Sequence, residues 1–500
     1  MDIAEVMAPT GLPASTLRYD EEKRLIASTG RRGLRRVFAT AVLERLALVA
    51  LGRAAGFSLD EVKAMLTTDA SLAIDRGGAQ AGCCGAQLSG AAAHCRARRT
   101  GGGWVTIGRP RRRRSCPPVF FDHAARRRSQ TMFSIILNVI GSLFHFYAAQ
   151  RIHRVGPIRN RIPARAWWAG AILVWIVYLW GVQLGDEAID WRWWPGQFAL
   201  TWLGVLFLMT LCLLVADLLT GFGLWWRIQA PRLLGIAAVA GVLVSAFAIF
   251  QAVRAPAISE YEVTLKNLPK ELDGMVLVAV SDLHLGAQRR SDWMAQRVEQ
   301  INALKPAAVL MVGDQVEDEP LGEPQLAVVL QRLKAPRGVW AVTGNHEFYG
   351  DVDTTITEFT AGGVRWLRNE QVELAPGLML AGIDDIGRTM RGGGAYLGGL
   401  DKVAPRDSGV ATILLCHIPA TPIVDGAAAR GVGLMLSGHT HGGQIWPFNY
   451  LVQRQFPRYI GAYKVGKMDL VVSRGAGGWG PRMRLWQPGE IVKLTLRPGA

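Results

Sequence analysis

Five stretches in the second half of the chain decide its fold: MVLVAVSDLH (275–284), AAVLMVGDQVED (307–318), GVWAVTGNHE (338–347), ATILLCHIP (411–419) and VGLMLSGHTHGG (432–443). Each stretch begins with a short apolar run that is typical of a buried strand, and helical patterns separate the runs. We therefore predict an α/β domain over residues 255–500. Ligand crevices in α/β sheets lie at the carboxyl ends of strands, so we expect the five polar tails to meet at one place.

The polar tails carry side chains that bind transition metals. Five of the nine histidines of the chain fall within these tails. A single Asp or His after a strand is usually a turn residue, but five such tails together indicate a metal site. Mixed carboxylate and imidazole ligands suit Mn, Fe or Zn. The candidate residues are Asp282, His284, Asp314, Asn345, His346, His417, His439 and His441.

The motifs DxH, GD, GNHE, a later single His and GHTH resemble, in this order and spacing, those of the calcineurin-like metallophosphoesterase superfamily. The resemblance covers about residues 272–495. It implies a four-layer α/β/β/α sandwich with two divalent metal ions. By position, one ion would be held by Asp282, His284 and His441. The other would be held by Asn345, His417 and His439, with Asp314 bridging the two.

One local departure from the family pattern is GDQVED, in which the second Asp of the usual GDxxD stands one residue later, at Asp318. The departure leaves the bridging position, Asp314, in place. Two ions about 3.5 to 4 Å apart can bridge a hydroxide for in-line attack on a phosphoester. We expect Asp314 and His346 to be catalytic, with His346 protonating the leaving oxygen or stabilising the charged transition state.

A later stretch bears on the substrate. VVSRGAGGWG (471–480) resembles a segment of membrane-associated family members that act on phosphodiesters. Arg474 is therefore a candidate contact for a substrate phosphate, and a pairing with a sheet carboxylate is the alternative. The expected activity is a phosphoesterase acting on phosphodiesters, lipid-linked substrates included.

The region 132–254 predicts a membrane anchor. Apolar stretches at 133–150, 166–184, 198–222 and 233–253 are each about long enough to cross a hydrocarbon core of roughly 30 Å, and Trp residues flank them. The first connecting loop carries five arginines, whereas the second carries three acidic residues and one arginine. The positive-inside rule then places the catalytic domain outside the cytoplasm, in the cell (inner) membrane. Arg126–Arg128 argue for the opposite orientation. Asp217, within the third stretch, is either a helix-packing group or a functional site.

The first 70 residues have a different character. TGLPASTLRYDEEKRLI (10–26) resembles the helix-turn-helix of MerR-type transcription regulators, and residues 41–66 match the next helices of that family. The resemblance implies a small all-α winged helix-turn-helix segment with DNA as partner. Asp20 and Arg24 depart from the family pattern, and no long dimerisation helix follows Leu66. The candidate DNA contacts are Ser15, Thr16, Arg18 and Tyr19 in the helix and Arg35 in the wing.

Residues 71–131 form a basic connector of unusual composition. The net charge of the chain is +16, and residues 76–131 contribute twelve arginines against the single Asp122. Two hypotheses fit: the connector is a frameshift product joining a regulator fragment to a protein that starts near Met132, or it is a disordered linker in a real fusion. The alternative function is accordingly a MerR-like DNA-binding regulator fused to a membrane sensor domain.

Overall fold

The computed structural model describes residues 26, 28–32, 35–38 and 42, and then residues 123–184, 193–385, 398–404 and 409–499. The chain divides into two compact units, Met1–Ser115 and Cys116–Ala500. In the first unit, β1 (Ser28–Arg32) and β2 (Arg35–Phe38) pair as an antiparallel hairpin. This hairpin lies where the sequence predicts the wing, and it includes Arg35. The helix positions Ser15, Thr16, Arg18 and Tyr19, and nearly all of the basic connector, lie outside the described residues.

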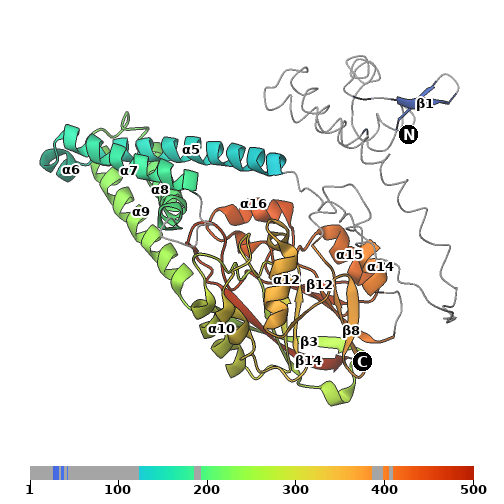
Figure 1. Ribbon diagram of the computed structural model, residues 1–500. Helices are drawn as coiled ribbons and strands as arrows, with labels where there is room; N and C mark the ends of the chain where they lie inside the picture. Colours follow the sequence, from blue (N-terminus) through green and yellow to red (C-terminus); the bar gives the residue numbers. More distant parts are fainter. Residues whose placement is uncertain are drawn as a thin grey trace, which may run out of the picture. The chain divides into compact units, whose positions relative to one another are not determined.

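The second unit begins with a bundle of helices (Figure 1). They are α5 (His123–His153), α6 (Gly156–Arg161), α7 (Ala164–Leu184), α8 (Trp193–Leu219) and α9 (Ala230–Val253). Among the described residues, four segments of these helices are long and apolar enough to cross a membrane: Ser134–His153, Ala164–Leu184, Trp194–Leu219 and Ala230–Val253. These segments confirm the four predicted apolar stretches to within a few residues.

Asp217 lies inside the helix bundle and is almost fully buried. Its Oδ2 accepts a hydrogen bond from the Tyr147 hydroxyl at 2.5 Å and pairs with Arg151 Nε at 2.7 Å. Both partners belong to α5, so the carboxylate ties α8 to α5. The arrangement supports the helix-packing interpretation of Asp217 over the functional one.

The rest of the second unit contains two six-stranded sheets. The first sheet has the order β3-β14-β4-β5-β6-β7. Its strands are β3 (Ala257–Lys266), β14 (Glu490–Gly499), β4 (Val276–Val280), β5 (Ala308–Val312), β6 (Val339–Val342) and β7 (Val364–Trp366). The second has the order β12-β13-β11-β10-β9-β8. Its strands are β12 (Gly461–Val465), β13 (Met468–Val472), β11 (Leu434–Ser437), β10 (Ala411–Leu415), β9 (Leu378–Gly382) and β8 (Glu370–Ala375).

The two sheets pack face to face, with helices on their outer faces. A core that includes Leu277, Leu310, Ile413 and Leu434 draws residues from both sheets. The outer face of the first sheet packs against α10 (Ser291–Ala303), α11 (Pro324–Leu330) and α12 (Val352–Ala361). The outer face of the second sheet packs against α14 (Gly398–Val403) and α15 (Thr421–Ala429). The predicted α/β/β/α sandwich is confirmed.

The sandwich also contacts the helix bundle directly. Leu208 of α8 and Ala248 of α9 form a buried apolar cluster with Ile445, Met483 and Leu485 of the sandwich. The amide of Arg484 donates to the carbonyl of Ala248 at 2.9 Å. The middle of α8 and the last part of α9 are thus packed against two loops of the sandwich.

Candidate metal centre

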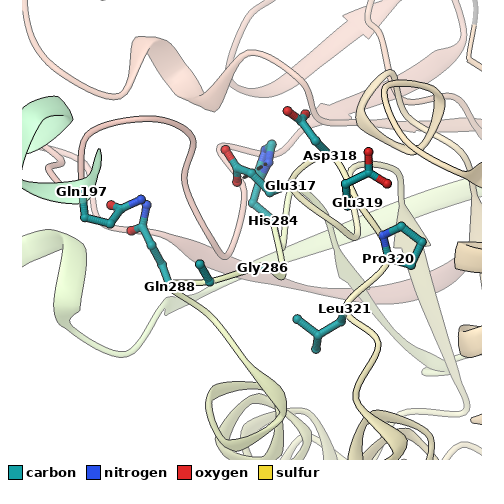
Figure 2. Close-up of a pocket in the computed structure, with 10 residues that line it drawn as sticks. Gln197, His284, Gly286, Gln288, Glu317, Asp318, Glu319, Pro320 and Leu321 are labelled. Carbon is teal, nitrogen blue, oxygen red and sulfur yellow. Dashed lines mark ion pairs between the residues drawn. The ribbon is translucent and has the colours of Figure 1, made fainter. Parts of the chain in front are cut away.

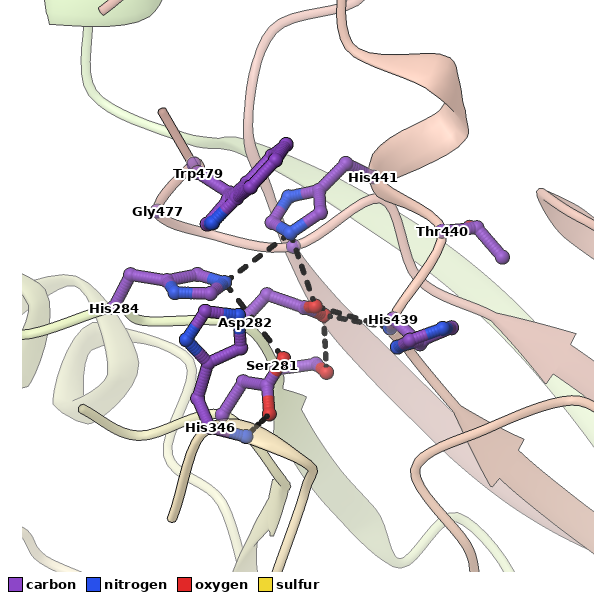
Figure 3. Close-up of polar contacts among 12 residues, drawn as sticks. Ser281, Asp282, His284, His346, His439, Thr440, His441, Gly477 and Trp479 are labelled. Carbon is purple, nitrogen blue, oxygen red and sulfur yellow. Dashed lines mark hydrogen bonds and ion pairs between the residues drawn. The ribbon is translucent and has the colours of Figure 1, made fainter. Parts of the chain in front are cut away.

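The carboxyl ends of five strands bring the polar tails together. β4, β5 and β6 are neighbouring parallel strands of the first sheet, and β10 and β11 are neighbouring parallel strands of the second. Figure 3 shows Asp282, His284, His346 and His441, which follow β4, β6 and β11, with their side chains close together. The candidate residues therefore meet at one place, as the strand pattern predicts.

The first group of converging side chains is Asp282, His284 and His441, whose potential ligand atoms all lie within 4.8 Å of one another. The Nε2 atoms of His284 and His441 are 3.2 Å apart, and His441 Nε2 is 3.4 Å from Asp282 Oδ1. All three residues are buried. Two imidazole nitrogens and a carboxylate oxygen facing the same small space make a suitable ligand set for a divalent cation.

The second group is Asp314, His417 and His439. Asp314 Oδ2 lies 3.0 Å from His417 Nε2 and 3.8 Å from His284 Nε2, which belongs to the first group. One carboxylate oxygen is thus shared between the two groups. A shared carboxylate is the arrangement needed to bridge two ions.

Asn345 provides a test of whether a metal ion fits beside the second group. Its Nδ2 donates to the hydroxyl of Tyr349 at 3.1 Å. Its Oδ1 is buried and finds no hydrogen-bond partner among the described residues. A buried amide oxygen without a partner is costly, and coordination to a cation would satisfy it. The donor set therefore fits the expected metal.

Two of the histidines are oriented by contacts at their other ring nitrogens, His417 by a hydrogen bond and His284 by an ion pair. His417 Nδ1 lies 2.7 Å from the carbonyl of Val312, so this nitrogen carries the proton and Nε2 is left as a ligand. His284 Nδ1 lies 3.1 Å from Glu317 Oε2, and this contact likewise leaves Nε2 of His284 as the ligand atom. Such second contacts fix the tautomer and the ring orientation of metal-ligating histidines.

His346 differs from the other histidines in its surroundings. Its Nδ1 contacts the carbonyl of Glu317 and lies 3.1 Å from Asp318 Oδ1. Burial alone would lower the pKa of His346, but the carboxylates of Asp314, Asp318 and Glu317 outweigh it and raise the pKa to about 10. These carboxylates favour the protonated form of His346, which suits a proton donor.

The carboxylate of Asp314 is held in its charged form. Burial would raise its pKa, but His417 and His346 lower it well below the usual range. The amide of His346 also donates to Asp314 Oδ1 at 3.0 Å. The neighbouring Glu347, fully buried, accepts hydrogen bonds from the amides of Asp314, Gln315, Val316 and Gly344. Glu347 thereby fixes the two loops that carry the GD and GNHE motifs.

Five candidate ligands have left-handed backbone conformations, with φ between 47° and 70°. This region is rarely occupied by residues with a Cβ and costs of order 1 kcal/mol or more each. Such residues cluster at functional sites, where the surrounding structure holds them in place. The residues are Asp282, His284, Asp314, His439 and His441.

Two glycines of the motifs are required by close approach. A Cβ on Gly344 would lie 2.1 Å from Asp314 Oδ1, and a Cβ on Gly438 would lie 1.9 Å from Ser281 Oγ. Neither neighbour has room to move, because Asp314 and Ser281 are themselves buried and hydrogen-bonded. The G in GNHE and in GHTH therefore allows the strand ends to approach one another.

Arg474 is turned toward a sheet carboxylate. Its Nε donates to the carbonyl of Pro488 at 2.7 Å, and its Nη1 lies 3.4 Å from Glu490 Oε2. This geometry is the alternative to a phosphate contact that the sequence leaves open. The guanidinium that approaches the centre instead is Arg484, whose Nη2 donates to the carbonyls of Arg474 and Gly477 and lies 3.5 Å from His441 Nδ1.

Sequence reasoning missed several residues that support the centre. Arg484 and Arg289 are buried cations in the loops around it, and Glu317 and Asp318 each contact a histidine. A signal was present for the last two, because a metal-ligating histidine usually has a carboxylate or carbonyl partner. The GDQVED segment supplies two acidic side chains directly after a predicted ligand.

A pocket opens beside the centre (Figure 2). It is lined by His284, Glu317 and Asp318 from the sandwich and by Gln197 from α8. In the figure the amide of Gln197 points toward Gln288 at one side of the pocket, while Glu317 lies against His284 at the other. A residue of a candidate membrane span therefore contributes to the wall of the pocket.

A four-layer α/β/β/α sandwich with clustered His and Asp side chains at the strand ends defines a metal-dependent hydrolase. A family model described as calcineurin-like phosphoesterase matches residues 275–443. An uncharacterised metallophosphoesterase of Aquifex aeolicus is 33% identical over 247 residues, which are 48% of this chain and 91% of that protein. An uncharacterised metallophosphoesterase of Campylobacter jejuni is 31% identical over 263 residues, 51% of this chain and 68% of that protein. The chain belongs to the calcineurin-like phosphoesterase family.

Two further matches were found, one to a relative described as transmembrane and one to the first part of the chain. A protein of Bos taurus described as a transmembrane protein with metallophosphoesterase domain is 32% identical over 277 residues, which are 52% of this chain and 62% of that protein. A second family model, described as MerR HTH family regulatory protein, matches residues 1–69. In the described part of this chain, the four long apolar helices indicate a membrane protein.

Proposed function

We propose that the chain is a membrane-anchored phosphoesterase with two divalent metal ions, Mn, Fe or Zn, that hydrolyses phosphodiester bonds, lipid-linked ones included. The observation that carries the proposal is the position of Asp314. Its Oδ2 lies near Nε2 of His284, in the first group of side chains, and near Nε2 of His417, in the second. We assign the first ion to Asp282, His284 and His441. We assign the second to Asn345, His417 and His439, with Asp314 shared.

The bound ions would supply a hydroxide nucleophile near neutral pH and positive charge for the phosphoryl oxygens. The chain's own residues orient this chemistry. Val312 and Glu317 hold the Nδ1 atoms of His417 and His284, which keeps both Nε2 atoms directed at the centre. The amide of His346 donates a hydrogen bond to Asp314 Oδ1, which favours the charged carboxylate.

His346 is the proposed proton donor to the leaving oxygen. Its Nδ1 is occupied by the Glu317 carbonyl and Asp318, so Nε2 is the ring nitrogen left for a substrate. Asp318 and the carboxylate of Glu317, which lie beside the ring, favour its protonated form, as a proton donor requires. Arg484 positions His441 and the 474–477 loop rather than contacting the substrate.

Hydrolysis assays on the purified full chain in detergent test the proposal. A chromogenic phosphodiester and the matching monoester would be compared with and without added Mn²⁺, beside an Asp314→Asn control. We expect metal-dependent turnover that favours the diester and is abolished in the control. Equal turnover in the control, or turnover independent of metal, would contradict the assignment of Asp314.

We further propose that the chain lies in the cell (inner) membrane and that its sandwich lies outside the cytoplasm. The support is the charge of the loops: the segment between α5 and α7 contains Arg154, Arg159 and Arg161, while residues 185–192 contain three acidic residues and one arginine. A cysteine placed at the exposed Lys266 should react with a membrane-impermeant maleimide in intact spheroplasts. Reaction only after lysis would reverse the orientation.

DNA binding by the first 70 residues is the second candidate function. It is supported by the family match over residues 1–69 and by the β1–β2 hairpin, which lies where the wing of such regulators is expected. A gel-shift titration of the full chain in detergent tests it. Sequence-selective binding that resists moderate salt would favour the regulator. Binding that is lost in salt for every DNA sequence would show only non-specific attraction between the basic residues and the phosphates.

A further inference from the structure

Large apolar side chains are exposed on two loops of the sandwich beside the metal centre. They belong to α16 (Phe448–Gln455) with the segment just before it, and to the segment 479–486. Soluble surfaces seldom gather exposed aromatic residues in this way, and Trp and Tyr are enriched where a protein meets the membrane interface. We call this set the aromatic rim: Trp446, Phe448, Tyr450, Leu451, Trp479 and Trp486.

The aromatic rim is continuous with the surface of the membrane spans. The ring of Phe448 stacks on Phe207 of α8, with centroids 4.7 Å apart, and Trp486 lies against Phe247 of α9 at 5.9 Å. Phe247 and Trp486 are both exposed. Exposed apolar side chains of α9 therefore adjoin exposed apolar side chains of the sandwich at this contact.

The rim loops contact α9 close to its end and contact α8 at Phe207, near the middle of that helix. Ala248, which packs against the rim loops, lies five residues before the end of α9 at Val253. At 1.5 Å of rise per residue, this contact is roughly 8 Å from the end of the helix. The head-group region of a bilayer has a similar depth. Arg254, at the end of α9, and Arg454, in the last turn of α16, add positive charge that suits anionic head groups.

The rim loops also carry the metal centre. Gln444 follows the short helix η3 (His441–Gly443). Its side chain donates to the carbonyl of Trp479 at 2.7 Å and accepts from the amide of Trp479 at 3.0 Å. Its carbonyl accepts from the amide of Leu485 at 2.9 Å. In Figure 3 the ring of Trp479 lies beside His441. The rim and a candidate ligand are thus parts of one hydrogen-bonded structure.

We propose that the aromatic rim inserts into the membrane interface and presents the metal centre to phosphoesters carried by lipids of the same membrane. The claim that the substrates are lipid-borne phosphoesters rests on the proposed function. The claim that the rim inserts into the membrane rests only on the exposed side chains of the rim and their contacts. The lipid bilayer is the chosen occupant because the rim extends the lipid-facing surface of α8 and α9. A lipid head group would then reach the pocket beside Gln197 without leaving the interface.

Insertion is tested without any turnover. Leu451→Cys would be made in the full chain, with its own six cysteines replaced by alanine, and labelled with an environment-sensitive fluorophore in lipid vesicles. The matched control is Lys266→Cys, an exposed residue at the end of β3 far from α9. We expect lipid-borne nitroxide to quench the label at 451 at least threefold more than the label at 266.

Two results would overturn the insertion. One is a label at 451 that aqueous iodide quenches as strongly as the control label, because the rim would then face water. The other is a label at 451 shielded from both quenchers, because the rim would then be covered by protein. Either result leaves the hydrolase proposal untouched, since no activity is measured.

The preference for lipid-borne substrates is tested by the ratio of turnover on a lipid substrate to turnover on a soluble one. Leu451→Asp and Lys266→Asp would be assayed in vesicles on a phospholipid diester in the bilayer and on a soluble chromogenic diester. A charge at the rim disfavours insertion, so we expect Leu451→Asp to lower the ratio of lipid to soluble turnover by about tenfold, with no change for Lys266→Asp. An unchanged ratio overturns the lipid preference. Absence of turnover on both substrates in the parent chain would instead refute the proposed function.

Discussion

Asp217 and Asp314 are buried to the same degree, each with 2% exposure, in opposite surroundings. Asp217 lies in the helix bundle, where Tyr147 donates to it and Arg151 balances its charge. Asp314 lies in the sandwich among His284, His346 and His417, whose ring nitrogens converge on one space. The chain completes the first arrangement by itself. The second, by our proposal, is completed by ions, and its left-handed backbone is held for that purpose.

The largest expected effect is on Asp314. Asp314→Asn keeps the shape of the side chain and removes its charge, so the shared oxygen no longer balances two cations. We expect turnover to fall on the order of a thousandfold or more, with loss of bound metal measured by elemental mass spectrometry. Unfolding in the presence of a chelator should change little. Full turnover with full metal content would refute the bridging role.

The second effect is on the stability of the bundle. Asp217→Leu leaves Arg151 buried without a partner, which should destabilise the bundle by about 3 kcal/mol, measured by unfolding in a detergent titration. The matched double variant Arg151→Met with Asp217→Leu should recover most of this loss, because no charge is left unpaired. A double variant as unstable as the single one, or lost turnover in folded protein, would assign Asp217 more than a packing role.

A smaller effect is expected at the contact behind the first ion. Glu317→Gln weakens the hold on His284 Nδ1 and should lower metal affinity by roughly ten- to a hundredfold, measured by metal titration. Asp318→Asn is the matched control, because Asp318 contacts His346, which is not a proposed ligand. Its expected effect is on the rate at saturating metal. Equal loss of affinity in both variants would show that the two acids act together.

The smallest effect concerns an exposed carboxylate. Asp351 begins α12 and accepts hydrogen bonds from the Thr354 hydroxyl and the amides of Thr354 and Asp353. These bonds lower its pKa. Asp351→Ala should cost about 1 kcal/mol at neutral pH. Because the folded pKa is the lower one, the stabilisation is present above the unfolded pKa of about 3.9 and is lost as the pH falls through the folded value.

Thermal unfolding of the parent and Asp351→Ala chains across pH 3 to 7 measures this difference. The gap between the two should narrow at the acidic end. The control is Asp353→Ala, in the first turn of the same helix but not at its cap. A gap that widens toward low pH would show that the carboxylate is stabilised in its protonated form.

The sequence was sufficient for the architecture because strand and span patterns are local. The apolar runs before Asp282, Asp314 and His417 mark strands whose ends must meet, and the four apolar stretches mark the helices. The α/β class and the convergence of the Asp and His side chains follow from these patterns, whereas the four-layer sandwich was predicted from the family resemblance. The ligand assignments and the DNA contacts stay predictions.

What the sequence could not show depends on neighbours that are distant along the chain. The burial of Arg289 and Arg484 is one example, since nothing near either residue marks it as buried. The turn of Arg474 toward Glu490 is another, because Glu490 lies sixteen residues further on. The left-handed conformations of the motif residues also come from packing between strand ends and not from local preference.

Gln197 has a practical consequence for enzymology. Because this α8 side chain forms part of the pocket wall, a soluble fragment that starts after α9 would have a pocket with one side missing. The same fragment would expose Ile445, Met483 and Leu485 to water. Rate constants measured on such a truncation would describe an altered enzyme, and its solubility would suffer as well. Inhibitor screening on this chain therefore calls for the intact protein in nanodiscs.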